Sequence, residues 1–386
     1  MQYCKGNSPV RRCSILVALS FAGLVPSALS RSAVADAFDG YRLYQQFSLP
    51  AGAGPYDVLP DGRLIVVVGS DLWIETSRAS RSFSPASSLA GADMATFGAA
   101  FARVSPNGSK IAVGNNGGVL GNHYQIGVFA FPSLTGTWFT TNHFDAAWID
   151  ETHLAVSSGD FANPSIVSVL DLTSPDPTTP INPTVVNNIG GASGGLAFDS
   201  AGNLYTGNGY QFAGPSETGV VKAFSAASWT GALAGGPPLD FEAMGTLVVE
   251  TLSASPLGFD HRGNIVIGGG DFSSLDDYGF VGVAGAAALA SALTGGGPID
   301  TGDQGQFRRL DPDPGSAFNF YSFVLDDGSK SLYVRDAGSG LVYVYLDTSS
   351  VPAASTWGMV VLGLCIVGAA TLRLRAGEIR REVGRV

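Results

Sequence analysis

Cysteine is almost absent from this chain of 386 residues, and the three cysteines present all lie near its ends. Cys4 and Cys13 fall in the first 37 residues, and Cys365 falls in an apolar stretch close to the C-terminus. The body between these ends therefore has no disulfide, no thiolate nucleophile and no cysteine-ligated metal. Its stability must come from a packed core.

Basic residues are also scarce. Between Phe38 and Thr356 there are 12 Lys and Arg against 29 Asp and Glu, a net charge of −17. A surface of this sign repels the phosphate backbone, which excludes DNA and RNA as partners. It attracts divalent cations and basic partners, and it also keeps a protein soluble without any specific partner.

The N-terminal 37 residues have the pattern of a signal peptide. Arg11 and Arg12 precede an apolar run from Ser14 to Val25, and small residues follow up to Ala37. A basic region, an apolar region and a small-residue cleavage site in this order direct a protein to export. The alternative is an N-terminal anchor that stays uncleaved.

The C-terminus has a second apolar segment. Trp357 to Leu372 is uncharged, and a cluster of arginines follows directly. We expect a box over 351–358, a transmembrane helix over 359–375 and a basic cytoplasmic tail over 376–386, because cytoplasmic ends carry the Lys and Arg excess. A buried core helix is the alternative. The body, residues 38–350, is then held outside the cell at the envelope.

The order of box, apolar helix and arginines resembles the PEP-CTERM and IPTL-CTERM class of bacterial sorting signals. The matching residues are Val351, Pro352, Ser355, Trp357, Gly358, Arg373 and Arg375. The resemblance implies processing by an exosortase-type membrane protease, with removal of the helix. The glutamate that follows the proline in the best-known box is Ala353 here.

The body is a repeat of six related segments. Each has an apolar strand, a polar turn and a second apolar strand that ends in Gly, Asn, Asp or Ser. The segments are Pro55–Asp71, Phe101–Gly117, Asp145–Asp160, Gly195–Gly209, Pro256–Asp271 and Tyr321–Gly338. Five of the turns contain a glycine, which reaches positive φ without penalty and favours a hairpin.

Several of these strands are continuous apolar runs, such as "IVVV" from Ile65 to Val68. Such runs indicate strands that are buried on both faces, as in sheets stacked blade against blade. With a third and a fourth strand in each unit, the pattern predicts an all-β fold, a six-bladed β-propeller. The isolated segment Tyr41–Leu49 is predicted to supply the outer strand of the last blade. A seven-bladed ring and a pair of β-sandwiches remain open.

The repeat resembles NHL-type and SMP-30/gluconolactonase-like propellers, most closely over Gly195–Gly209. The resemblance implies the propeller architecture. In SMP-30-like enzymes it also implies a divalent metal near the pore that activates water for lactone hydrolysis. The metal ligands of that family do not match this chain residue by residue.

Oxygen-bearing side chains follow the second strand of every unit. In a propeller they lie on one face, and hard cations such as Ca²⁺ bind six to eight oxygens. The candidate metal ligands are Asp71, Asn116, Asp160, Asn208, Asp271 and Asp336. The alternative is that Asn and Asp serve there as ordinary turn formers. No cofactor beyond a possible Ca²⁺ is predicted.

The sequence contains none of the common catalytic motifs of hydrolases, kinases or dinucleotide-binding enzymes. We therefore predict a non-catalytic propeller that binds an envelope or matrix component, either a carbohydrate or a protein, with no assigned catalytic residue. A metal-dependent lactonase or esterase-like hydrolase is the alternative, and a purely structural envelope component is a third. Two acidic stretches, 268–280 and 299–316, are the expected places for recognition.

Overall fold

The computed structural model describes the central part of the chain. The described residues are 40–89, 94, 98–116, 124–158, 165–174, 183–190, 192–210, 219–251, 254–269, 280–310, 321–336 and 338–347. The predicted signal peptide and the C-terminal segment 351–386 lie outside them. Within these ranges, no helix has both the length and the apolar character needed to cross a membrane.

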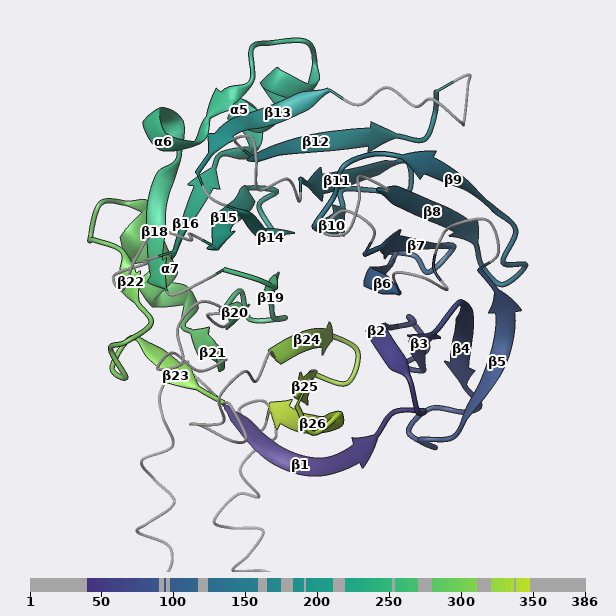
Figure 1. The fold of residues 1–386 in the computed structure, drawn as a ribbon. Coiled ribbons are helices and arrows are strands. Elements are labelled where there is room, and N and C mark those ends of the chain that lie inside the picture. The colour runs from purple at the N-terminus through teal and green to yellow at the C-terminus, as the bar shows by residue number, and fades with distance from the viewer. Residues whose placement is uncertain are drawn as a thin grey trace, which may run out of the picture.

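Six sheets stand around a central opening, as Figure 1 shows. Blade 1 consists of β2 (Ala53–Val58), β3 (Leu64–Val68), β4 (Asp71–Glu75) and β5 (Phe83–Ser88). Blade 2 consists of β6 (Ala99–Val104), β7 (Lys110–Asn115), β8 (Gln125–Ala130) and β9 (Gly136–Thr140). Blade 3 consists of β10 (Asp145–Trp148), β11 (His153–Ser157), β12 (Ser165–Asp171) and β13 (Thr184–Ile189).

The second half of the ring follows the same plan. Blade 4 consists of β14 (Ala192–Phe198), β15 (Leu204–Tyr210), β16 (Gly219–Phe224) and β18 (Thr246–Thr251). Blade 5 consists of β19 (Leu257–Phe259), β20 (Ile265–Gly269), β21 (Phe280–Ala284) and β23 (Phe307–Arg309). Blade 6 consists of β24 (Tyr321–Asp326), β25 (Ser331–Asp336), β26 (Leu341–Asp347) and β1 (Tyr41–Ser48).

The predicted ring closure is confirmed. β1 pairs antiparallel with β26, and Tyr41 lies opposite Asp347 in their register. The first strand of the chain therefore completes the last blade, so that β26 is not left as an unpaired edge. The six-bladed propeller is confirmed with it, and the seven-bladed and sandwich alternatives are excluded.

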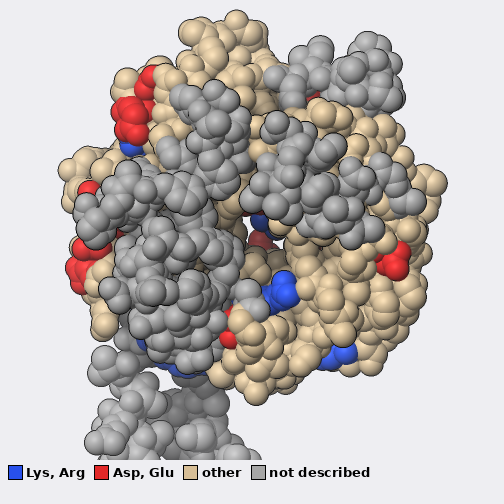
Figure 2. All heavy atoms as spheres, in the orientation of Figure 1, with Lys and Arg blue, Asp and Glu red and all other residues tan. Residues whose placement is uncertain are grey.

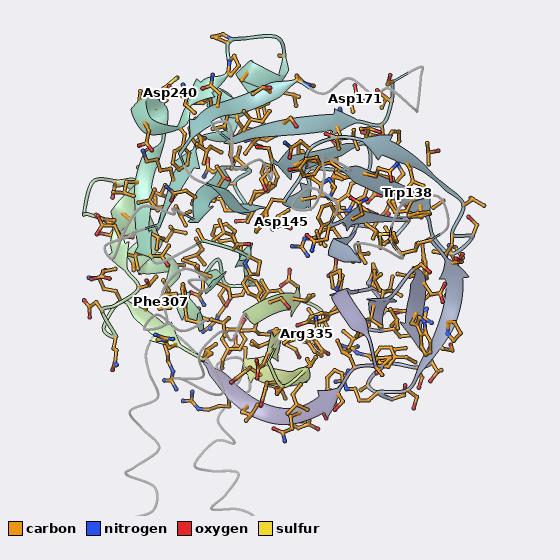
Figure 3. The ribbon with its side chains drawn as sticks, viewed as in Figure 1. Trp138, Asp145, Asp171, Asp240, Phe307 and Arg335 are labelled. Atoms are coloured by element: carbon orange, nitrogen blue, oxygen red, sulfur yellow. The ribbon has the colours of Figure 1, made fainter. Side chains whose placement is uncertain are left out.

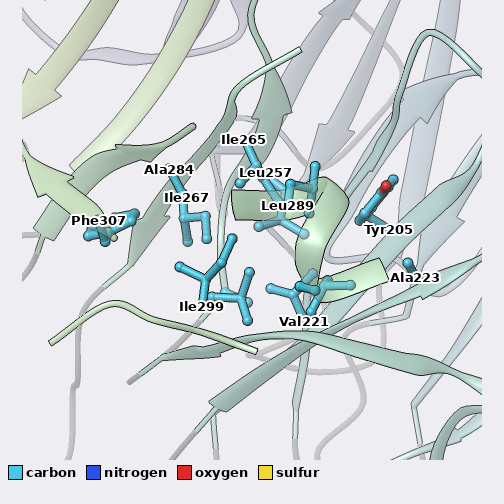
Figure 4. Close-up of a cluster of buried hydrophobic side chains, with 14 of the residues drawn as sticks. Tyr205, Val221, Ala223, Leu257, Ile265, Ile267, Ala284, Leu289, Ile299 and Phe307 are labelled. Carbon is cyan, nitrogen blue, oxygen red and sulfur yellow. The ribbon is translucent and has the colours of Figure 1, made fainter. Parts of the chain in front are cut away.

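The core is divided among the six interfaces between neighbouring blades. Ile65 and Val67 of β3 pack toward blade 2, while Leu64 and Val66 of the same strand pack toward blade 6. Because successive side chains of a strand point to opposite faces, this arrangement requires an unbroken apolar run. Figure 4 shows the cluster between blades 4 and 5, where Phe307 and Ile265 are fully buried.

Blades 4 and 5 carry helical insertions that the sequence analysis did not predict. They contain α5 (Ala226–Leu233), α6 (Phe241–Met244) and α7 (Ala286–Leu293). Each insertion also adds a two-residue parallel strand to the outer edge of the preceding blade, β17 (Leu239–Asp240) on β13 and β22 (Ile299–Asp300) on β18. Two blades therefore have five strands instead of the predicted four.

The propeller has two unlike faces, which are named here for their connections. The terminal face carries the hairpins between the first and second strand of each blade, and it is where β1 begins and β26 ends. The loop face carries the connections from second to third strand and from one blade to the next. Four predicted ligand residues lie at the loop-face ends of strands or just after them: Asp71, Asn116, Asn208 and Asp336.

Candidate functional site in the central opening

The first strand of each blade lines the central opening, and three consecutive blades place a charged residue there. Asp57 lies on β2, Arg103 on β6 and Asp145 on β10. Figure 2 shows a hollow at the centre of the face in view, with basic and acidic atoms at its wall. We refer to Asp57, Arg103 and Asp145 as the channel cluster.

Arg103 is held between its own blade and blade 3. Its Nη2 lies 2.5 Å from Oδ1 of Asp145, and its Nε donates to the carbonyl of Ala146 at 2.9 Å. The indole of Trp148 donates back to the carbonyl of Arg103 at 3.0 Å. These contacts fix the guanidinium, so Arg103 is a preorganised positive charge rather than a mobile surface side chain.

Asp145 is buried, and burial raises the pKa of its carboxyl, while Arg103 and the amide of Ala146 oppose that rise. Asp57 accepts hydrogen bonds from the amides of Val58 at 2.8 Å and Val104 at 2.6 Å. Burial nevertheless raises the pKa of Asp57 to about 6, with Arg103 again acting in the opposite direction. Arg103 therefore lowers the pKa of both carboxyls, in opposition to the effect of their burial.

A second basic group lies across the opening. Figure 3 places Arg335 and Asp145 on opposite sides of it. Arg335 donates to the carbonyls of Gly54 at 3.0 Å and Ala53 at 2.8 Å, and so ties blade 6 to blade 1. Its burial lowers the pKa of the guanidinium, which stays charged at neutral pH.

His143 supports the wall next to the channel cluster. It is buried between Phe101 and Tyr124, with edge-on ring contacts at 5.5 and 5.7 Å. Its two ring nitrogens face the carbonyls of Thr141 at 2.9 Å and Asn115 at 2.6 Å. Burial lowers the pKa of this imidazole. His143 therefore joins blade 2 to the start of blade 3.

Four of the six predicted metal ligands lie among the described residues. Asn208 accepts from the amide of Val220 at 2.6 Å, and Asp336 accepts from Gly338 at 2.8 Å, so both close their own turns. Asp71 is half-buried at the start of β4, and Asn116 is exposed just after β7.

The other two predicted ligands, Asp160 and Asp271, lie outside the described residues, as do the sorting-signal residues 351–375. Among the residues that the structure describes, no three His, Cys, Asp or Glu side chains lie together in a group that could hold a metal ion. The predicted ring also uses the oxygens of asparagine. The six-residue ring therefore stays a prediction.

The channel cluster was missed by the sequence analysis, although a signal for it exists. The inner strands read "PYDVL" around Asp57, "FARV" around Arg103 and "FDAAW" around Asp145. A charge inside a strand that is otherwise apolar in this repeat is costly unless it is paired. An alignment of the first strands of the six repeats would have identified all three residues of the channel cluster as charged positions on the inner strands.

No family model and no curated protein matches this sequence. Among solved structures, the PQQ-bound aldose sugar dehydrogenase of Streptomyces coelicolor aligns with a TM-score of 0.54, 10% identity, and 79% of this chain and 97% of that one covered. A carbohydrate-active enzyme of family AA12 from Trichoderma reesei, solved with calcium, aligns at 0.50 with 11% identity, covering 81% and 98%.

A structure described as a putative gluconolactonase aligns with a TM-score of 0.46 and 14% identity, covering 78% of this chain and 93% of that one. At these identities the likeness establishes the fold alone. The chain is thus similar in fold to propellers found in sugar-directed enzymes.

Proposed function

We propose that this protein is a sugar-directed hydrolase that opens a lactone or ester at the channel cluster. The observation that carries the proposal is the convergence of Asp57, Arg103 and Asp145 from three blades, with the pKa of Asp57 raised to about 6. A general base works best when its pKa lies near the operating pH. The similar folds in known sugar-directed enzymes support the choice of substrate class.

In this proposal Asp57 accepts a proton from a water molecule as that water attacks the carbonyl carbon of the substrate. Arg103 stabilises the negative charge that develops on the carbonyl oxygen. The bond from the carbonyl carbon to the ring or ester oxygen then breaks, and the proton passes from Asp57 to the departing oxygen. Asp145 is a positioning residue, because it acts through Arg103.

The experiment is hydrolysis of aldonolactones by the purified full chain. Asp57→Asn is expected to lower kcat/KM by at least about 100-fold, the usual contribution of a general base. The control is Asp61→Asn, which changes an exposed aspartate of the neighbouring turn. Full activity in Asp57→Asn, or no turnover by the wild-type chain on any lactone or ester, would overturn the proposal.

A metal-dependent form of the same hydrolase would use the predicted ring of Asp and Asn oxygens on the loop face. Oxygen ligands suit Ca²⁺, and a bound cation would polarise the carbonyl of the substrate. Metal analysis of the purified chain separates the two forms. If the purified chain contains one bound ion per molecule and a chelator abolishes lactone turnover, hydrolysis requires the metal ion held by the ring of Asp and Asn oxygens. Asp57 alone would then not account for the activity.

A non-catalytic binding module is the second candidate. It is favoured by the export and anchoring segments predicted at the two ends, which suit a protein that presents a surface to an envelope or matrix carbohydrate or protein. Retention of a carbohydrate by both the wild-type chain and Asp57→Asn, with no turnover by either, would select this function. The channel cluster would then bind the carbohydrate without catalysing its hydrolysis.

For location, we propose export, anchoring at the cell envelope by residues 359–375, and recognition of residues 351–358 by an exosortase-type protease. Cell fractionation of the full chain and of a chain that ends at residue 350 tests the anchor. Intact mass of the mature protein tests the processing. Recovery of both chains in the cytoplasm would reject export and anchoring together.

A further inference from the structure

Two arginines reach the central opening, and they differ in what balances their charge. Arg103 contacts the carboxylate of Asp145, so its positive charge has an acidic partner at 2.5 Å. Arg335 lies on the other side of the opening, as Figure 3 shows. It forms no ion pair with any residue that the structure describes, and its hydrogen bonds go to the neutral carbonyls of Ala53 and Gly54. Of the two cations, Arg335 is therefore the one that lacks a counter-charge.

The guanidinium of Arg335 also has donors that the protein does not use. An arginine carries five N–H groups, and the bonds to Gly54 and Ala53 use one on Nη1 and one on Nη2. Its Nε has no hydrogen-bond partner in the described part of the chain. The side chain is half-buried rather than enclosed. Arg335 therefore has one unused N–H on each terminal nitrogen and a charge that the propeller alone does not satisfy.

The acidic groups near Arg335 do not supply the missing charge. Burial lowers the pKa of the Arg335 guanidinium, and Tyr56 and Asp336 act in the opposite direction. Asp336 follows Arg335 in β25, so its side chain points to the other face of the strand. It accepts from the amide of Gly338 at 2.8 Å and closes its own turn. The hydroxyl of Tyr56 donates to the carbonyl of Tyr333 at 2.9 Å, and burial raises its pKa, so it is uncharged at neutral pH.

Arg335 and the channel cluster lie along the same inner strand. Arg335 bonds Ala53 and Gly54 at the loop-face start of β2, and Asp57 follows three residues after Gly54 toward the terminal face. At the rise of a β-strand this separation is about 10 Å. Ser322 lies opposite Arg335 in the register of β24 and β25, and its small side chain leaves a path for the arginine to reach β2. A sugar that presents its carbonyl to Asp57 would therefore place its other end near Arg335.

We propose that the substrate opened at the channel cluster is an acidic sugar lactone whose carboxylate binds Arg335. The planar guanidinium matches a carboxylate with parallel hydrogen bonds, and the two charges strengthen each of them. Binding supplies a counter-charge to a cation that is already partly desolvated. The inference rests on the proposed hydrolase. It makes Arg335 a specificity-determining residue, because it contacts the substrate away from the carbonyl that is attacked.

The test compares two lactones with the purified full chain. Glucaro-1,4-lactone has a carboxylate at the carbon where glucono-1,4-lactone has a hydroxymethyl group. We expect the wild type to have the higher kcat/KM for glucaro-1,4-lactone, and Arg335→Gln to lower that preference at least about tenfold, mainly through KM. Arg335→Lys keeps a positive charge without the planar fork, so its loss should be smaller. The control is Arg63→Gln, which removes a positive charge from a terminal-face turn and should keep the wild-type preference.

The outcomes separate a specificity role of Arg335 from a structural one. Equal losses on the two lactones in Arg335→Gln would mean that Arg335 only ties blade 6 to blade 1, and this result overturns the inference while hydrolysis at Asp57 stands. A wild type without preference for the acidic lactone overturns it as well. If Arg335→Gln does not fold, Arg335→Lys is judged by the same comparison.

A binding measurement covers the case in which the wild type hydrolyses neither lactone and the proposed hydrolase fails. Calorimetry then compares galacturonate with galactose on the wild type, Arg335→Gln and Arg335→Lys. Tighter binding of galacturonate by the wild type, with loss of this preference in Arg335→Gln, supports a carboxylate site that is independent of catalysis. Equal binding of the two sugars, or binding of neither, overturns the inference together with the hydrolase.

Discussion

The terminal face and the loop face are built from the same strands, yet they stabilise their connections differently. At the terminal face of blades 4 and 5, an Asp-x-x-Gly-Asn turn closes on itself: Asp260 accepts from the amide and side chain of Asn264. At the loop face, single side chains such as Asn208 start connections of varied length. The terminal-face turns of these two blades are therefore closed by the same pair of residues, whereas the loop-face connections differ from blade to blade.

Two buried aspartates with an arginine partner can be compared, one at the ring closure and one in the central opening. Asp347, at the terminal face, receives Arg262 Nε at 3.0 Å and His261 Nε2 at 3.1 Å. Asp145, at the first residue of β10, has one cationic partner among the described residues, Arg103 at 2.5 Å, and it also accepts from the amide of Ala146. Asp347 joins blade 5 to the closing strand pair, while Asp145 joins two blades that are already covalently consecutive. The same chemistry therefore has a structural role at the ring closure and a candidate functional role in the central opening.

The largest expected effect is at the ring closure. Asp347→Ala removes the buried carboxylate that contacts Arg262 and His261, and it leaves Arg262 with the longer contact to Asp260 at 3.7 Å. This loss is expected to lower the free energy of unfolding by about 3–4 kcal/mol. Urea unfolding of the full chain measures it. Glu250→Ala, at an exposed carboxylate of β18, is the control and should stay within about 0.5 kcal/mol of the wild type. Equal stabilities would mean that the closure does not depend on this ion pair.

Asp145→Ala is expected to destabilise less, by about 2–3 kcal/mol, because only one cation loses its partner. Its effect on function should be the greater of the two, since Arg103 loses the contact that orients it toward the channel. The comparison is made by measuring unfolding and lactone turnover for both variants. If Asp347→Ala impairs turnover of the folded protein more than Asp145→Ala does, the structural role of Asp347 and the functional role of Asp145 are wrongly assigned.

The raised pKa of Asp57 implies that the stability of the protein depends on pH. Its pKa of about 6 in the folded protein lies above the ordinary value of 3.8, so the folded state binds more protons than the unfolded chain between these values. The free energy of unfolding therefore falls as pH rises from about 4 to about 6. Burial also raises the pKa of Asp145, which adds a contribution of the same sign.

Because Asp57 is half-buried, solvent screening limits the size of this change to about 1–2 kcal/mol. Asp57→Asn removes the contribution, so the difference in stability between variant and wild type should vary over this pH window and be constant above pH 7. Urea titrations at a series of pH values measure that difference. A constant difference across the window would contradict the raised pKa.

The sequence was sufficient to predict the ring because its signals are local and repeated. Gly202 and Gly263 do adopt positive φ of 79° and 78° in their turns, as the turn pattern requires. The apolar runs follow directly from burial against two neighbouring blades. The closure by β1 could be predicted because the sixth repeat contains only three strand-like segments, while Tyr41–Leu49 precedes the first repeat and belongs to none.

The parts that were missed depend on contacts distant in sequence. α5 and α7 have eight residues each, too short to be stable alone, and are held by tertiary packing of Trp229 and Leu289. Consecutive members of the channel cluster are about 45 residues apart in the sequence. They come together only when blades 1, 2 and 3 pack against one another. The sequence of a single strand does not show which residues of other blades will be its neighbours. Within its own strand, each of these charged residues is a single departure from the apolar pattern.

The smallest predicted effects compare one asparagine from each face. Asn264 donates to Asp260 and accepts from the amide of Ala286 at 2.9 Å, so it both closes its turn and supports the start of α7, where Gly285 provides no side-chain cap. Asn208 accepts from the amide of Val220 at 2.6 Å, its one side-chain hydrogen-bond partner among the residues that the structure describes. Asn264→Ala is expected to cost about 1–2 kcal/mol and Asn208→Ala about 1 kcal/mol.

Unfolding in the presence and absence of Ca²⁺ turns this pair into a test of the predicted metal ring. If Asn208 is a ligand, Ca²⁺ stabilises the wild type and Asn264→Ala but not Asn208→Ala, because a bound ion adds stability only where its site is complete. If Asn208 only closes its turn, Ca²⁺ has the same effect on all three chains. The second result would mean that Asn208 has a structural role only, as Asn264 has in its own turn.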